Sequence, residues 1–572
     1  MNKHTIKRII KYGGGILLLA IISMGIAAFY LSAKWKPVIT EKIKEGVYTG
    51  SNRLYRINFK DIHLNLWSGN VKLDSITLIP DTQVYRQLKP AYLFELKAAA
   101  LKISRIGILT AYFSQKIKMN SIVLDQPSIN MIYEKAPRKR DKDEKTLYQQ
   151  IAKTLKSIRI GHISINDANF DYYKGTEKQH EIRHLNMTIK DFLVDSLSQY
   201  DTTRIYHAKD IAFELAGYRA LTKDKMYTLK IDTIKGSVDR KSIGISGLKL
   251  IPMYPDLTFS RKYKAQKDRY DLNFNQVKFN GVDFIKLNNT GNLHARQLII
   301  GPANVAIFLN RELPPPNFDK GRNYPHIALK RLPITTLIDT VSLNKIDIAY
   351  TEYNPKTKER GTLKLDNLSG PILNVTNDSV ALLKNHKAYA NLNTYLMGKG
   401  KMNVKIDFNL TDNNGAFSYV GNIGPINLQT LNPLAKALGQ LTIESGNVQK
   451  MNFKVDANLK AAKGEVNFYY QDLKINLLKE GEDGKAKGKG LLSFLANTVL
   501  IKNDNPIKGE ALRIANTTFE RVPQASFFNL MWKTVFVGVR TAVGIGVVPV
   551  KPMPEPKPGS NNQKKEKLKK VN

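Results

Sequence analysis

Apolar and polar residues alternate strictly along much of this chain. In Met402–Leu410 and again in Met451–Leu459, every second residue is apolar, and the residues between them are Asn, Lys or Asp. Tyr270–Phe274, Val466–Tyr470 and Leu473–Leu477 continue the pattern. Successive side chains of a β-strand point to opposite faces, so each stretch predicts a strand with one apolar and one polar face. Buried parallel strands would read as continuous apolar runs, so the pattern predicts a mainly β fold of antiparallel, one-sided sheet.

A strand unit of this kind occurs twice. The first copy begins at Ile163 and the second at Val341, and a loop in the second copy is five residues longer. The matched residues are Ile163-Ser164-Ile165-Asn166 with Val341-Ser342-Leu343-Asn344, Phe170-Asp171-Tyr172 with Ile348-Ala349-Tyr350, Ile182 with Leu365, Leu185 with Leu368, Ile189 with Ile372, and Asp195-Ser196 with Asp378-Ser379. Units with one apolar face bury that face by stacking on their neighbours. We therefore expect a sheet that grows by the addition of similar strand units.

The first apolar stretch predicts a membrane anchor. Gly13–Ala33 contains no charged residue, and lysines or arginines lie on both sides of it. Its length suits a helix that crosses a bilayer core of ~30 Å. A cleavable signal peptide is the alternative, but the exit site Leu31-Ser32-Ala33 lacks a small residue three positions before the cut. We expect a single transmembrane helix over residues 13–33, preceded by a cytoplasmic segment, 1–12.

Changes of composition divide the rest of the chain. The expected regions are a first β-rich region (34–310), a Pro-rich linker or wrapped loop (311–335), a second β-rich region (336–520), an apolar C-terminal helix (521–548) and a disordered basic tail (549–572). A few short helices are expected besides, including one in Asn427–Gly439. The apolar C-terminal helix carries two charges, which suits a helix at the membrane interface better than a membrane span. Its interface residues would be Phe527, Phe528, Trp532 and Phe536. An ordinary core helix that closes the end of the sheet is the alternative.

Charge and cysteine content limit the kinds of site and of binding partner that this chain can have. The chain has 88 Lys and Arg against 49 Asp and Glu, a net charge of +39, and no Cys. The absence of Cys excludes disulfides, thiolate zinc sites and cysteine nucleophiles. Lysines are spread along the strands, and no nucleic-acid recognition motif accompanies them, so we expect no nucleic-acid partner. An anionic membrane surface is the expected counterpart of this charge.

One motif predicts metal chemistry. His180-Glu181-Ile182-Arg183-His184 has the HExxH spacing, which on a helix would let His180 and His184 bind Zn²⁺ with Glu181 as general base. The repeat, however, aligns this stretch with Leu363–Asn367, which has the pattern of a strand. Residues four apart in a strand lie roughly 13 Å apart, too far to share one ion. We therefore reject a zinc hydrolase and expect no enzyme activity, metal or cofactor.

The anchor, the opening unit Tyr55–Pro80 and the stretch Leu431–Leu477 together resemble the AsmA-like family of bacterial envelope proteins. The resemblance implies an inner-membrane anchor with the body in the periplasm. It also implies an elongated, twisted sheet whose apolar side forms a groove for lipid acyl chains. The family has no catalytic residues to transfer to this chain.

The strands of the second β-rich region supply the candidate acyl-chain face. Its residues are Val404, Ile406, Phe408, Phe453, Val455, Phe468 and Ile475. We expect the protein to move phospholipid or another lipid between the inner and outer membranes, with a partner at the outer membrane, and so to support outer-membrane integrity. The alternative is a structural or scaffolding periplasmic protein, built from closed β-domains, that assists outer-membrane protein assembly. An open apolar face favours lipid transfer, whereas closed cores favour the scaffold.

Overall fold

The computed structural model describes residues 35–65, 68–88, 90, 92–107, 110, 113–133, 147–152, 155–198, 200–439, 441–480, 486–488 and 501–544. The predicted anchor at 13–33, the segment 1–12 before it and the tail 549–572 lie outside these described residues. The chain divides into two compact units. Unit 1 contains the described residues of 1–253, 272–303 and 334–341, and unit 2 contains those of 254–271, 304–333 and 342–572.

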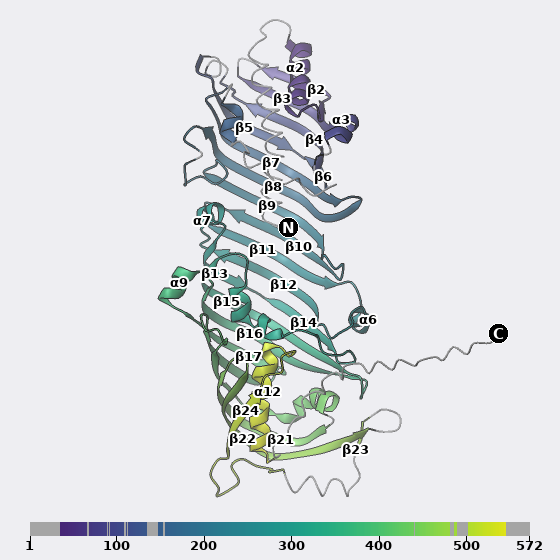
Figure 1. The fold of residues 1–572 in the computed structure, drawn as a ribbon, viewed down its shortest axis with the longest axis vertical. Helices are drawn as coiled ribbons and strands as arrows, with labels where there is room; N and C mark the ends of the chain where they lie inside the picture. Colours follow the sequence, from purple (N-terminus) through teal and green to yellow (C-terminus); the bar gives the residue numbers. More distant parts are fainter. Residues whose placement is uncertain are drawn as a thin grey trace, which may run out of the picture. The chain divides into compact units, whose positions relative to one another are not determined.

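Unit 1 is mainly β, as the alternation predicts. Its elements are α2 (Trp35–Gly50), β1 (Tyr55–Asn58), β2 (Asp61–Asn65), β3 (Asn70–Pro80), α3 (Thr82–Leu88), β4 (Tyr92–Ser104), β5 (Lys116–Asp125), β6 (Ser128–Tyr133), α5 (Leu147–Ile151), β7 (Ser157–Lys174), β8 (Glu177–Asp195), β9 (Asp210–Leu221), β10 (Tyr227–Ser237), β11 (Ser242–Pro252), most of β12 (Arg269–Asn280), α7 (Phe284–Asn289) and β13 (Leu293–Ile300). From β7 to β13, each strand pairs antiparallel with the next along the chain (Figure 1).

The expectation of purely antiparallel pairing is wrong at β7. This strand runs parallel to β5 and β6, with Ile122 opposite Ile163 and Ile129 opposite Phe170. A parallel neighbour needs a long crossover connection, and the segment between Tyr133 and Ser157 is long enough to provide one. Elsewhere in the described pairings of unit 1, the strands are antiparallel.

The N-terminal strands of unit 1 are covered by a helix. In α2, Ile39, Ile43 and Val47 are spaced by four residues, so they lie on one face, and all three are buried. They share a hydrophobic core with residues of β1 to β5, β7 and β8, among them the fully buried Leu73 and Ile158. Burial of an aliphatic side chain contributes about 1.5–3 kcal/mol. The first β-strands therefore form a closed core with α2.

Unit 2 is also mainly β. Its elements are α6 (Asp256–Arg261), most of β14 (Ala303–Asn310), η1 (Lys320–Asn323), α8 (Pro325–Lys330), most of β15 (Thr336–Asn354), β16 (Glu359–Thr376), α9 (Ser379–Lys384), β17 (Lys387–Leu396), β18 (Gly400–Asn409), β19 (Phe417–Ile423), β20 (Ile426–Asn427), η2 (Leu428–Leu431), α10 (Asn432–Leu434), η3 (Ala435–Gly439), β21 (Leu441–Ala457), β22 (Ala461–Glu480), β23 (Ala486–Gly488), β24 (Ile514–Glu520) and α12 (Phe527–Ala542). The predicted helix in Asn427–Gly439 is present as three consecutive short helical segments, the 3-10 helix η2, the α-helix α10 and the π-helix η3.

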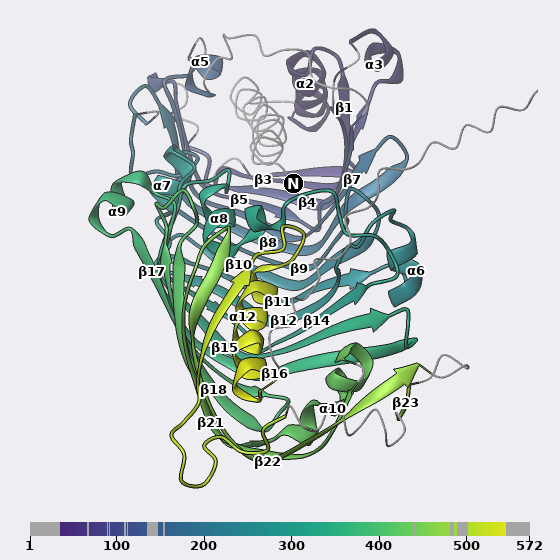
Figure 2. The same ribbon diagram turned by 60° about the horizontal axis from the view of Figure 1, so that its bottom comes forward.

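The strands of unit 2 carry a second core, which α12 closes. The helix packs along strands of this sheet, β22 and β24 (Figure 2). The phenol of Tyr419 donates to the carbonyl oxygen of Met531 in the helix at 3.0 Å. Gly538 permits this approach, because a Cβ at that position would overlap Val466. The helix begins at Ser526, whose hydroxyl accepts a hydrogen bond from the Asn529 amide.

The predicted repeat is confirmed as two long hairpins. The first is β7–β8, and the second is β15–β16, where the hydroxyls of Thr351 and Thr362 lie 2.9 Å apart across the strands. The two copies also share a backbone feature that the sequence does not reveal. Matched positions adopt positive φ, namely Asp167 with Lys345, His184 with Asn367, and Asp191 with Asn374. Because β-strands bend and twist where such residues interrupt them, both hairpins are bent at equivalent points.

Candidate functional site

The seven residues of the predicted acyl-chain face lie in the core of unit 2. Phe408, Phe453, Val455 and Phe468 are between 0 and 8% exposed. Ile406 is also buried, and Val404 and Ile475 pack against the same cluster while partly exposed. The alternation therefore identifies the apolar side of these strands, and the side chains on that side belong to one hydrophobic core or pack against it.

Protein elements cover this side of the strands. Phe527 at the start of α12 packs against Phe408 and Phe417, with ring centroids 5.9 and 5.0 Å away. His326 of α8 also packs against Phe408, with ring centroids 5.2 Å apart, and donates its Nε2 proton to the carbonyl oxygen of Gly415 at 3.0 Å. The segment 311–335, expected as a linker or a wrapped loop, contains η1 and α8 and so supplies part of this cover. In the described structure, the predicted acyl-chain residues contact protein, in a closed core.

Helix α12 has two different faces. Phe527 is 6% exposed in the core, whereas Phe528 and Trp532 are 63% and 42% exposed. Phe536 stacks on Trp532 at 4.8 Å, so Phe528, Trp532 and Phe536 form one aromatic stripe at four-residue spacing. The helix closes the sheet, as one of the two sequence-based alternatives states. A role of the stripe at a membrane interface stays a prediction.

The HExxH residues lie on a strand, as the repeat predicts. His180 and His184 belong to β8 and have different partners. His180 Nδ1 lies 3.0 Å from the hydroxyl of Tyr218, and His184 Nδ1 lies 2.7 Å from a carboxylate oxygen of Asp167. Glu181 lies 3.2 Å from the guanidinium of Arg183. No group of three His, Cys, Asp or Glu side chains in the described part of the chain is arranged to hold a metal ion.

His184 has a structural role instead. Its φ is +50°, and the matched residue in the second hairpin, Asn367, has φ +56°. His and Asn are among the residues that most often adopt this left-handed conformation. The second histidine of the motif therefore occupies a bend position of the strand.

Sequence reasoning missed an apolar face in the middle of unit 1. Each of four consecutive strands carries residues at spacing i, i+2, i+5 and i+7, all apolar apart from one glycine. These residues, which we call the β9–β12 face, are Phe213, Leu215, Tyr218 and Ala220 in β9, Leu229, Ile231, Ile234 and Gly236 in β10, Ile243, Ile245, Leu248 and Leu250 in β11, and Leu272, Phe274, Val277 and Phe279 in β12. The most buried members of β9, Leu215 and Ala220, are five residues apart, and so are those of β10, Ile231 and Gly236.

Strand register joins these residues into rows across the sheet. Leu215 pairs with Ile234, Ile234 with Ile245, and Ile245 with Val277. On the other side of the bend, Ala220, Leu229, Leu250 and Leu272 form a second row in the same way. Directly paired residues of neighbouring strands project from the same face. The rows are therefore continuous over four strands.

In β9 and β11, the extra residue between the two halves of the pattern has a backbone cause. Gly217 and Gly247 have φ of +74° and +62°, and both lie level with Asp232 of the strand between them. A Cβ at Gly247 would overlap the carboxylate of Asp232, so glycine is required there for space as well as for conformation. These two left-handed residues interrupt the two-residue period, and side-chain exposure follows the interrupted period: in β9, Leu215 and Ala220 are buried, whereas Glu214 and Arg219 are exposed.

The opposite face of these strands is polar. Lys235 and Glu214 form an ion pair at 2.8 Å across β10 and β9, and Lys249 reaches Asp232 at 4.0 Å. All four side chains are 40 to 65% exposed. Surface pairs of this kind contribute at most about 1 kcal/mol each. Their importance here is that they mark the solvent side of the sheet and so confirm its one-sided character.

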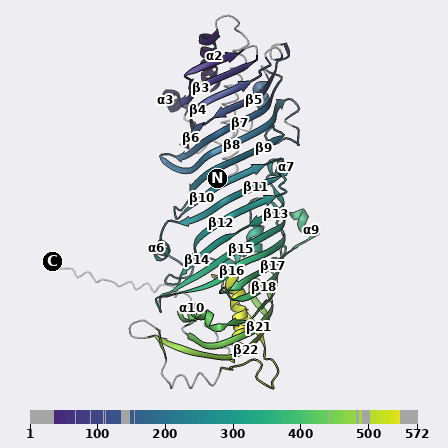
Figure 3. The same cartoon turned by 180° about the vertical axis from the view of Figure 1, so that it is seen from behind.

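Within the described part of unit 1, helices do not cover the β9–β12 face. Neither hydrophobic core among the described residues includes a side chain of β9 to β13. Among the helices of unit 1, none that is labelled lies over β9 to β11 in two opposite views (Figure 1, Figure 3). Most large members of the face are half-buried. A contiguous apolar face without a second layer is typical of an interaction site.

Three side chains at the border of this face add hydrogen-bonding groups. Tyr172 pairs with His180, and His180 pairs with Ala220, so the border residues continue the second row. The His180 ring lies 5.6 Å from the ring of Tyr172 and 6.1 Å from that of Tyr218. Burial lowers the pKa of His180 and raises those of both tyrosines, so all three are neutral at pH 7.

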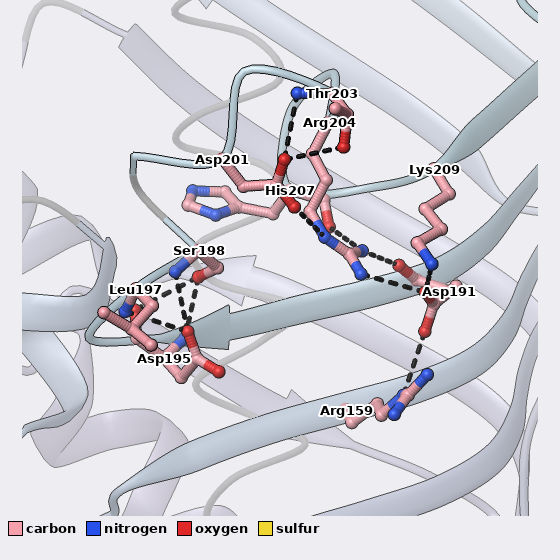
Figure 4. Close-up of polar contacts among 10 residues, drawn as sticks. All are labelled: Arg159, Asp191, Asp195, Leu197, Ser198, Asp201, Thr203, Arg204, His207 and Lys209. Atoms are coloured by element: carbon pink, nitrogen blue, oxygen red, sulfur yellow. Dashed lines mark hydrogen bonds and ion pairs between the residues drawn. The ribbon is translucent and has the colours of Figure 1, made fainter.

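A buried arginine holds the loop between β8 and β9. The Arg204 side chain is 5% exposed, and its Nη2 and Nε donate to Asp191 at 2.9 Å and to Asp201 at 3.1 Å (Figure 4). The other carboxylate oxygen of Asp191 accepts from Arg159 of β7 at 2.9 Å. Burial raises the pKa of Asp191, but these two arginines outweigh burial and leave the pKa below its usual range. The loop is therefore tied to two strands.

This loop exposes large apolar side chains, and the second hairpin does the same at matched positions. Leu197 and Tyr200 are 76% and 75% exposed after β8. Val380 and Leu383, at the same offset from the matched residues of the repeat, are 64% and 89% exposed after β16. The repeat therefore extends beyond the strands into the segments that follow them, which are a loop after β8 and the short helix α9 after β16.

The chain matches no protein-family model and no curated protein. Over the described residues, no helix combines the length and the apolar composition that a membrane span requires.

Proposed function

We propose that this protein is a membrane-anchored envelope protein that binds lipid acyl chains on the β9–β12 face and moves phospholipid between the inner and outer membranes. The observation that supports the proposal is the continuity of apolar rows across four strands without a covering helix. A peptide ligand would need polar partners for its backbone groups. An acyl chain has no such groups and matches a face that presents almost only carbon.

The expected energies are sufficient for this role. Burial of an acyl chain of some sixteen carbons stabilises the complex by ~0.8 kcal/mol per CH₂, on the order of 10 kcal/mol in total. The four strands lie about 4.8 Å apart, so their rows extend over some 14 Å, the length of roughly a dozen methylene groups. An open face with repeated, similar side chains binds a chain at many equivalent positions, which favours sliding over tight capture.

Charge and the resemblance to the AsmA-like family support the envelope location. The net charge of +39 suits anionic lipid headgroups, and the uncharged run 13–33 suits an inner-membrane anchor with the body in the periplasm. Protease added to spheroplasts should then digest the body while the inner membrane is intact. Protection of the body until the inner membrane is lysed would contradict this location.

The direct test of lipid binding is analysis of lipids that co-purify with the detergent-solubilised full-length protein. We expect phospholipid at about one or more molecules per chain. Ile245→Asp together with Val277→Asp should lower this ratio, because both residues lie in one row of the face. The matched control is Lys249→Asp with Lys278→Asp on the polar side, which should leave the ratio unchanged. Equal losses in both double variants would contradict the proposal.

The second candidate function is a scaffold that assists outer-membrane protein assembly. The closed core of unit 2 favours it, because a sheet covered by its own helix has no free apolar side for a lipid. The scaffold predicts that both double variants above leave co-purified lipid at background level.

A further inference from the structure

We propose that Tyr172, His180 and Tyr218 form a hydrogen-bonding site for the ester carbonyl oxygens of a glycerolipid whose acyl chains lie on the β9–β12 face. The inference rests on the proposed function and specifies the lipid class that this part of the face selects. It assigns a role to the first histidine of the HExxH motif that needs no metal.

The position of the three side chains supports the proposal. They come from three consecutive strands, β7, β8 and β9, and Tyr218 is itself a member of the β9–β12 face. Tyr172 and His180 are directly paired and half-buried. A bound chain in the row of Ala220 and Leu229 would therefore have its end beside polar atoms, where an acyl chain joins its glycerol ester.

The hydrogens available at this site can be counted without knowing the tautomer. His180 Nδ1 and the Tyr218 hydroxyl lie 3.0 Å apart, and the pair carries two polar hydrogens, one on the neutral imidazole and one on the phenol. Only one of these hydrogens is used in the bond between them. The other remains for a ligand, on Nε2 or on the phenol oxygen, and the Tyr172 hydroxyl supplies a further donor.

The ligand group must be a neutral acceptor. Among the described residues, no ion pair involves any of the three side chains, and all three are neutral. The three neutral donors carry no charge that would balance a phosphate group, whereas an ester carbonyl needs only a donor. Two donors at one end of an apolar row fit the two ester carbonyls of a diacyl glycerolipid.

The test compares binding of dioleoyl phosphatidylglycerol with that of its diether analogue, which lacks both carbonyl oxygens, to the full-length protein in detergent. We expect the wild type to bind the ester lipid about five-fold more tightly for each carbonyl engaged, the equivalent of about 1 kcal/mol. The triple variant Tyr172→Phe, His180→Phe and Tyr218→Phe keeps three rings and removes every donor, so it should bind both lipids equally. If the triple variant does not fold, Tyr172→Phe with Tyr218→Phe serves instead and should reduce the preference.

The matched control is Tyr173→Phe, which removes a phenol from the neighbouring position of β7, whose side chain contacts Lys178. It should keep the wild-type preference for the ester lipid. Equal binding of both lipids by the wild type, or an unchanged preference in the triple variant, would overturn the site while leaving acyl-chain binding intact. If neither lipid binds the wild type, the proposed function fails, and the site fails with it.

Discussion

The strands of unit 2 and the β9–β12 strands of unit 1 present the same chemistry to two different surroundings. Both sets are antiparallel, with apolar residues on one side and Lys, Asn or Asp on the other. In unit 2, α12 and α8 cover the apolar side, and Val455 and Val466 are fully buried. In the β9–β12 strands, most apolar side chains of the face stay half-exposed.

The difference teaches that alternation identifies an apolar face but not its occupant. A covered face stabilises the fold, and a substitution there is expected to affect stability. An uncovered face adds little to stability, so its apolar character needs another explanation, for which we propose lipid. The predictions below separate these two roles by placing equivalent changes in the two regions.

The largest expected effect follows from a charge in the covered region. Phe453→Asp removes a ring that is 8% exposed and leaves a carboxylate without a partner in the core of unit 2. We expect a loss of more than about 4 kcal/mol in the free energy of unfolding, enough to unfold unit 2. Thermal unfolding followed by circular dichroism, with limited proteolysis of unit 2, measures this effect.

The matched change in the uncovered region is Ile245→Asp. This residue is half-buried on β11, so water can reach the new carboxylate, and we expect a loss below about 2 kcal/mol. Similar destabilisation by both variants would mean that the β9–β12 face is packed like a core. The distinction between a covered face in unit 2 and an uncovered face in unit 1 would then be wrong.

Two glycine substitutions, one in each region, give a second matched pair of variants. Gly538→Ala places a methyl group against Val466 and should lift α12 from the sheet, at a cost of about 1–3 kcal/mol. Gly244→Ala on β11 has no atom within 4 Å of the new Cβ, so it should be neutral within about 0.5 kcal/mol. Chemical denaturation of each variant distinguishes them. Equal tolerance of alanine at Gly538 would show that α12 does not pack tightly on β22.

The loop caps should behave alike in the two copies of the repeat. Asp195 accepts the backbone amides of Leu197 and Ser198, and Asp378 accepts those of Val380 and Ala381. Replacement of either aspartate by alanine should cost about 1 kcal/mol, the usual value of a lost cap. Hydrogen exchange of the loop after β8 and of α9 after β16 measures the loss, with Asp339→Ala as an exposed control. A large effect at one cap alone would limit the equivalence of the copies to their strands.

The smallest effect is a pH dependence of stability in the covered region. Burial lowers the pKa of His326, which is 2% exposed between Phe408 and Phe417. Because the native state favours the neutral ring, its contribution to stability is complete above the ordinary histidine pKa near 6.5 and decreases as pH falls below that value. His326→Gln should remove this part of the acid sensitivity. An identical pH profile in wild type and variant would assign the sensitivity to other groups.

Much of the fold can be predicted from the sequence. The alternation at Met402–Leu410 and Met451–Leu459 reports β18 and β21, and the repeat reports both long hairpins and places His180 and His184 on a strand. Local patterns suffice for these features because each depends on the two-residue period of a strand and on nothing distant in the chain.

The candidate site could not be predicted in the same way. Phe453 and Val466 alternate as regularly as an exposed face does, and only tertiary packing shows that α12 covers them. In β9 to β12, the step from i+2 to i+5 interrupts the alternation, so Leu215 and Tyr218 do not read as one face. A search for the spacing i, i+2, i+5 and i+7, with glycine or another residue that tolerates positive φ at the step, would have found it.

The central claim is that lipid contacts the β9–β12 face and not its polar side. Photo-crosslinking amino acids at Ile245 and Val277, on the apolar side, and at Lys249 and Lys278, on the polar side, test it in intact cells. A crosslinker at Val455 provides the control for a covered apolar residue. The account predicts phospholipid adducts at Ile245 and Val277 and background at the other three positions. Equal capture from both sides of the sheet, or capture of protein alone at Ile245 and Val277, would contradict it.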